Sequence, residues 1–83
     1  MSNEEIALEI NRFLSEEFEV DEAKITPEAT LKETLELDSL DYVDMVVILE
    51  SNFGIKVKQE DFTSIVTFSD LYNYVISKQA SNG

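Results

Sequence analysis

Ser39, which directly follows Asp38, is the position in this chain best suited to chemistry on a hydroxyl group. Apolar residues recur at helical spacing after it, so we predict that a helix begins here with Asp38 as its N-cap. Free backbone N–H groups and the helix dipole at such a position favour a negative group such as a phosphate. A serine beside an aspartate is usually only part of a cap, so these two residues leave both interpretations open.

The chain contains no histidine and no cysteine. It therefore lacks the usual general base at neutral pH, the thiol nucleophile and the soft metal ligands. No other group in the sequence is suited to activate the Ser39 hydroxyl, so another enzyme would have to modify it. We predict that the chain is not an enzyme, that it has no catalytic residue and that it binds no metal.

The helix predicted from Ser39 to Phe53 carries apolar residues on two faces. The larger ones form a stripe for the protein core: Tyr42, Met45, Val46, Leu49 and Phe53. The second face combines apolar residues with an acidic border: Leu40, Val43, Val47, Asp41, Asp44 and Glu50.

Between Glu33 and Glu50 the sequence has six acidic residues and no lysine or arginine. Complete burial of this helix would therefore leave carboxylates without partners, which is costly. The border must face solvent or a basic partner. We predict a docking surface in which the exposed apolar residues anchor a partner and the carboxylates orient it.

The composition agrees with one small acidic domain spanning residues 1–83. Six basic residues face 18 acidic ones, and the net charge of -12 would repel nucleic acids and anionic membranes. A simpler interpretation of the acidity is that the charge keeps a small protein soluble. Repulsion between like-charged copies also favours a monomer, which we expect here. Hydrophobic residues make up 43% of the chain, enough for a packed core.

The N-terminal segment Met1–Glu5 has neither a basic region nor a long apolar run. We therefore expect no signal peptide and no membrane insertion. The absence of cysteine excludes disulfides. Together these features predict a cytoplasmic protein.

The predicted fold is all-α, a small four-helix bundle with three main helices, one short helix and a long loop between the first and second helices. Apolar spacing and capping residues set the boundaries. The expected elements are a helix at 3–18, a loop at 19–38, a helix at 39–53, an extended connection at 55–57, a short helix or turn at 59–65, a helix at 67–77 and a frayed tail from about 79 to 83.

The run Leu37-Asp38-Ser39-Leu40-Asp41, followed by acidic and apolar residues through Phe53, resembles the attachment motif of the acyl carrier proteins. The resemblance extends over most of the chain. It implies that a phosphopantetheinyl transferase joins Ser39 through a phosphodiester to 4′-phosphopantetheine from coenzyme A, with Asp38 and Leu40 flanking the arm. The arm would then hold acyl intermediates as thioesters for fatty-acid or related lipid or polyketide biosynthesis.

The same resemblance implies partners with basic patches, namely synthases, reductases, dehydratases and acyltransferases. Four acidic positions match residues that the family uses for such contacts: Asp38, Asp41, Asp44 and Glu50. The acidic border inferred from charge and the contacts implied by the resemblance thus agree. With the apolar anchors, the predicted partner surface comprises Asp38, Leu40, Asp41, Val43, Asp44, Val47 and Glu50.

Some residues depart from the family pattern. Glu36 and Leu37 stand where a glycine is common, and Ser51 and Asn52 stand where further acids are common. Phe62 is expected to narrow the family's internal pocket.

The identity of the cargo therefore stays open, and a carrier of aminoacyl or D-alanyl groups is one alternative. An acidic helical adaptor or calcium-binding module is another, although the acids lack the ligand spacing and glycine of an EF-hand loop.

Overall fold

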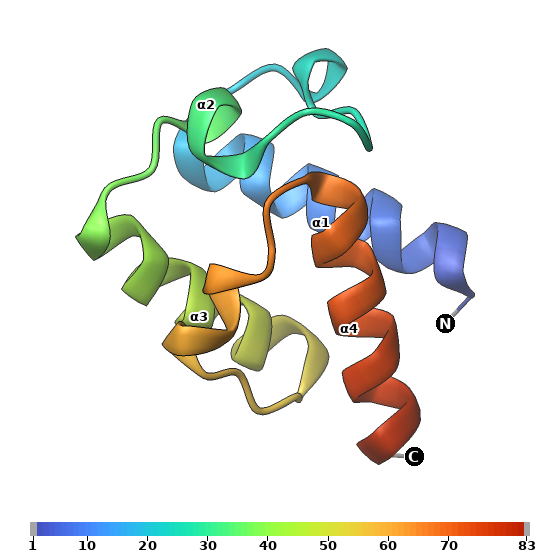
Figure 1. The fold of residues 1–83 in the computed structure, drawn as a ribbon. Helices are drawn as coiled ribbons and strands as arrows, with labels where there is room; N and C mark the ends of the chain where they lie inside the picture. Colours follow the sequence, from blue (N-terminus) through green and yellow to red (C-terminus); the bar gives the residue numbers. More distant parts are fainter. Residues whose placement is uncertain (1, 83) are drawn as a thin grey trace.

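The computed structural model describes residues 2–82 and the side chains of residues 2–80. Within that range the chain forms four α-helices and two short 3-10 helices (Figure 1). In chain order they are α1 (Asn3–Phe18), η1 (Glu22–Lys24), α2 (Leu31–Leu35), α3 (Ser39–Phe53), η2 (Gln59–Thr63) and α4 (Phe68–Asn82). The predicted all-α bundle with three long helices is confirmed.

The predicted long loop at 19–38 contains two helical turns, which the sequence pattern did not indicate. The 3-10 helix η1 follows the end of α1, and the five-residue helix α2 lies before α3. Five residues are too few to show a helical period, and α2 is held by burial of Leu31 and Leu35, which are 1% and 5% exposed. The short α-helix of the bundle is therefore α2. The segment predicted as a short helix at 59–65 is the 3-10 helix η2.

The helix α4 begins one residue after the predicted start and extends past Ser77 to Asn82. Its first turn is fixed by a reciprocal capping pair, since the Asp70 N–H donates to Thr67 Oγ1 at 3.2 Å and the Thr67 N–H donates to Asp70 Oδ2 at 3.2 Å. Hydrogen bonds from the backbone N–H groups of Thr67 and Val66 to the Asp70 carboxylate lower the pKa of Asp70. The frayed tail remains a prediction, and Gly83 lies outside the described residues.

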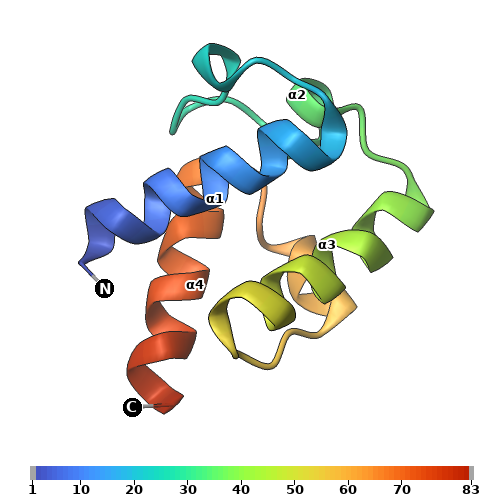
Figure 2. The ribbon, with the colours of Figure 1, turned by 180° about the vertical axis from the view of Figure 1, so that it is seen from behind.

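The core forms where α4 packs against α1 and α3. Figure 2 shows α1 crossing in front of the start of α4, with α3 to the right of α4. α4 contributes Phe68, Leu71 and Val75, which have no exposed surface. The rings of Phe13 and Phe53 join α1 to α3, with their centroids 5.7 Å apart. This core supports one side of α3 and leaves the other side uncovered.

Candidate functional site

The start of α3 is fixed by a reciprocal pair of carboxylates. Asp38 is the N-cap, and its Oδ1 accepts hydrogen bonds from the N–H groups of Leu40 at 2.9 Å and Asp41 at 3.0 Å. Asp41 Oδ2 in turn accepts from the Asp38 N–H at 3.0 Å. This is a complete capping box, as expected from an acid three residues after the cap. It places Ser39 as the first residue of the helix, where Ser39 is exposed to solvent.

The chain reaches this point through a left-handed turn at Glu36, where φ is 53°. Leu37 is then buried, with 6% of its surface exposed, and anchors the chain immediately before the cap. Glycine is the usual residue for a positive φ, and other residues are strained there. Glu36 therefore makes, at some conformational cost, a turn that glycine would make freely. This accounts structurally for one departure from the family pattern.

The capping box revises the expectation that free N–H groups at Ser39 favour a phosphate. Two of the donors at the helix start, those of Leu40 and Asp41, are already bonded to the Asp38 carboxylate. Asp38 and Asp41 also place negative charge beside Ser39. A free phosphate gains little at this position, so a phosphate group here requires a covalent bond.

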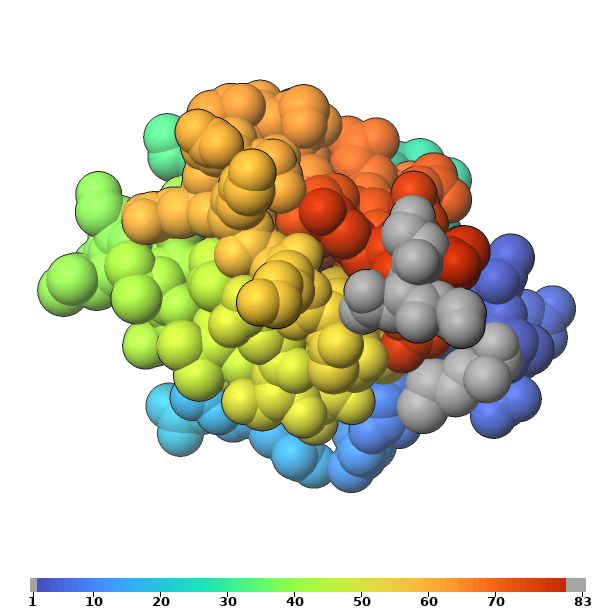
Figure 3. All heavy atoms as spheres, turned by 90° about the horizontal axis from the view of Figure 1, so that it is seen from below, coloured from blue at the N-terminus to red at the C-terminus, as the bar shows by residue number. Residues whose placement is uncertain are grey.

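The two faces predicted for α3 are present in the structure. On the core side Met45 and Leu49 have no exposed surface and Phe53 is 9% exposed, while Tyr42 and Val46 are half-buried. On the opposite side Leu40 is 75% exposed, Val43 46% and Val47 57%. We call these three exposed residues, Leu40, Val43 and Val47, the α3 strip. Figure 3 shows the face of the molecule where α3 lies beside η2 and α4.

The acidic residues around the α3 strip also have structural functions, of which only the N-cap role of Asp38 was predicted from the sequence. Glu50 Oε2 accepts a hydrogen bond from the Val57 N–H at 3.0 Å and so ties the extended segment after α3 to the helix. Asp38 and Asp41 form the capping box, and Asp44 is exposed. Among the described residues the one ion pair joins Arg12 to Glu9 on α1. No basic side chain in that part of the protein neutralises the α3 carboxylates.

Two hollows of about 270 Å³ each lie where α3 meets η2 and α2, and both are lined by Tyr42 and Phe62. Phe62 is 8% exposed, and its ring centroid lies 5.5 Å from that of Tyr42. Phe62, which was predicted to narrow the family's internal pocket, therefore lines two separate hollows, and the narrowing itself stays a prediction.

Comparison with known proteins agrees with this architecture. A family model described as "Phosphopantetheine attachment site" matches residues 9–75. The acyl carrier protein of Thermotoga maritima is 43% identical over 77 residues, which cover 93% of this chain and 95% of that protein. The acyl carrier protein of Rubrobacter xylanophilus is 37% identical, and acyl carrier protein 2 of Ralstonia nicotianae 40% identical, each over 81 residues that cover 98% of this chain and all of the relative.

The fold and the matched residues thus define a phosphopantetheine-bearing domain. More specifically, the chain belongs to the acyl carrier protein family. It is a carrier with a covalently attached 4′-phosphopantetheine group. The residues at the start of α3 fit that group, because an exposed serine hydroxyl offers a bond to the phosphate and solvent leaves room for the arm. The described helices include none long and apolar enough to cross a membrane.

Proposed function

We propose that Ser39 is the residue that bears the arm. The observation that carries the proposal is its position as the exposed first residue of α3, within the segment that matches the family. In the reaction Ser39 Oγ forms a bond to the phosphorus next to the pantetheine of coenzyme A. The bond from that phosphorus to the bridging oxygen breaks, adenosine 3′,5′-bisphosphate leaves, and the serine proton is released. The transferase supplies the base for this step, because the carrier has no histidine.

The thiol of the arm then supplies the nucleophile that the chain itself lacks. An acyl group bound to it as a thioester can be delivered to enzymes of fatty-acid or related lipid or polyketide biosynthesis. In this proposal the carrier is a single-domain, monomeric cytoplasmic protein that does not itself catalyse the acyl chemistry. Asp38 and Leu40 lie beside the phosphodiester.

The α3 strip and its acidic border form the docking surface in this proposal. Exposed apolar residues surrounded by charge are typical of small protein interfaces, and carboxylates without basic neighbours favour a basic partner. The partners are the phosphopantetheinyl transferase and acyl-processing enzymes with basic patches. The residues proposed to meet them are Asp38, Leu40, Asp41, Val43, Asp44, Val47 and Glu50.

The test is to incubate the protein without its arm with coenzyme A and a broad-specificity phosphopantetheinyl transferase, and then to measure the intact mass. We expect a gain of one phosphopantetheine that is abolished in Ser39→Ala. Ser51→Ala is the matched control, since Ser51 is an exposed serine on the same helix, and it should be modified like the parent protein. No gain with several transferases, or full modification of Ser39→Ala, would contradict the proposal.

A further inference from the structure

The two hollows beside α3 differ in the chemistry of their walls. The η2 hollow is lined by Tyr42, Gln59, Phe62 and Thr63. The α2 hollow is lined by Thr30, Lys32, Glu33, Tyr42, Phe62, Ile65 and Val66. The lining of the η2 hollow includes no charged side chain, whereas the α2 hollow is bordered by one lysine and one glutamate. An uncharged chain is therefore better accommodated in the η2 hollow.

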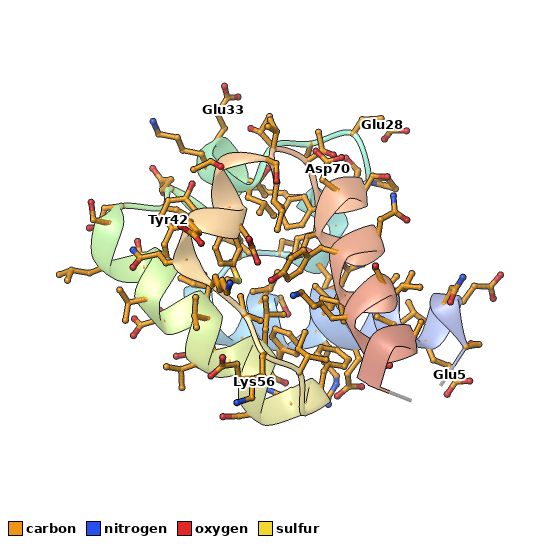
Figure 4. The ribbon with its side chains drawn as sticks, turned by 60° about the horizontal axis from the view of Figure 1, so that its bottom comes forward. Glu5, Glu28, Glu33, Tyr42, Lys56 and Asp70 are labelled. Atoms are coloured by element: carbon orange, nitrogen blue, oxygen red, sulfur yellow. The ribbon has the colours of Figure 1, made fainter. Side chains whose placement is uncertain are left out.

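The η2 hollow begins one helical turn from Ser39. Tyr42 follows Ser39 by three residues, and side chains three apart on a helix are neighbours. Figure 4 shows Tyr42 between α3 and η2. An arm on Ser39 that folds back along α3 would therefore bring the group it carries to this aromatic wall. An apolar group gains burial by lying against that wall.

The ring pair of Tyr42 and Phe62 stands between the two hollows, because both residues line both of them. The ring planes are inclined at 52°, an arrangement that aromatic pairs favour. Phe62 belongs to η2, and η2 is tied to α4 by a hydrogen bond of 2.6 Å from the Tyr74 hydroxyl to Asp61 Oδ2. Burial and then this carboxylate raise the pKa of Tyr74 to about 12, so the tyrosine remains a donor at neutral pH. The wall is therefore held in place.

The size of the η2 hollow limits what can lie in it. A water molecule takes up about 30 Å³ of liquid, and a methylene group is of similar size. A hollow of about 270 Å³ therefore accommodates roughly nine such groups. A longer chain would have to pass the ring pair to enter the α2 hollow or else remain in solvent.

We infer that the Tyr42–Phe62 pair limits the cargo of this carrier to short acyl chains of up to about eight carbon atoms, held in the η2 hollow. The inference rests on the proposed function, because it assumes an arm on Ser39. It assigns Tyr42 and Phe62 a role in selecting cargo by length.

The experiment loads acyl groups of increasing length, from four to sixteen carbons, from the corresponding acyl-coenzyme A with the transferase. Intact mass first verifies loading, and a failure at this stage contradicts the proposed function and not the length limit. The measurement is the rate of thioester cleavage by hydroxylamine, relative to the same acyl group on free pantetheine. We expect protection to rise up to about eight carbons, by at most about fourfold for each buried methylene, and to stay constant for longer chains.

Phe62→Ala should join the two hollows and extend the rise in protection to about twelve carbons or more. Phe53→Ala is the matched control: it removes a ring from the Phe13–Phe53 pair, which lines neither hollow, and should leave the limit unchanged. Circular dichroism checks that each variant is folded. If Phe62→Ala is not folded, Tyr42→Ser tests the same wall from the half-buried side of α3.

Three results would overturn the inference. One is protection in the parent protein that keeps rising to sixteen carbons, and another is no protection at any length. The third is a limit that stays at the parent length when the wall is removed in a folded variant.

Discussion

Asp38 combines two functions that substitutions can separate. Its carboxylate accepts two backbone hydrogen bonds at the start of α3, and its charge belongs to the proposed docking surface. Asparagine keeps an oxygen acceptor for the cap and loses the charge, whereas alanine loses both. The two variants therefore distinguish the stability of α3 from the recognition of a partner.

We expect Asp38→Ala to lower the free energy of unfolding by about 1 kcal/mol and Asp38→Asn to change it little, because asparagine is as good an N-cap as aspartate. Urea unfolding followed by circular dichroism measures both. The kcat/KM of arm transfer should fall in both variants, since both lose the charge. Equal destabilisation by the two substitutions would show that charge, and not capping, accounts for the stability effect.

At the scale of the element, α3 forms a wall of the core and, in our proposal, also a docking surface. Its buried side is packed against α1 and α4, and its exposed strip has no covering segment among the described residues. A polar substitution on the strip should therefore affect binding and leave the fold intact.

Val47→Asp should reduce kcat/KM for arm transfer at least tenfold, because a buried charge opposite an apolar partner surface weakens docking by 1.4 kcal/mol or more. The melting temperature should change little, since Val47 is 57% exposed. Leu8→Asp is the matched control, as Leu8 is an exposed apolar residue on α1, 66% exposed, away from the strip. A similar loss of transfer in Leu8→Asp would locate the effect outside α3.

The sequence predicted α3 well because its fifteen residues show a clear helical period and follow an N-cap. Gly54 ends the helix with a positive φ of 63°, a conformation that glycine adopts freely. It predicted α2 poorly because a helix of one turn and a half is determined by what its two leucines contact across the molecule. The hydrogen bond from the Val57 N–H to Glu50 likewise could not be predicted from the sequence. No local pattern distinguishes a carboxylate that faces solvent from one that binds a segment several residues away.

At the scale of the whole molecule, charge repulsion opposes folding. A net charge of -12 on 83 residues destabilises the compact state, and dissolved salt screens that repulsion. We expect the melting temperature to rise by about 4 °C or more between 10 mM and 500 mM sodium chloride, which corresponds to about 1 kcal/mol. Differential scanning calorimetry measures this rise.

The control for the salt effect is a variant with less charge and the same core. Glu16→Lys with Glu17→Lys changes two exposed residues of α1, each by two charge units, which takes the net charge from -12 to -8. Its melting temperature should rise less with salt than that of the parent protein. An equal rise in both would mean that salt acts through hydrophobic burial and not through charge repulsion.

The position of α4 in the chain also bears on the order of events during synthesis on the ribosome. Three side chains without exposed surface, Phe68, Leu71 and Val75, belong to α4, the last helix to be translated among those described. Until α4 has left the exit tunnel, the core that α1 and α3 share lacks these three side chains, and the Phe13–Phe53 ring pair joins the two helices without the support of α4. We therefore expect an enzyme that recognises the folded α3 to modify the chain efficiently only after α4 has been translated.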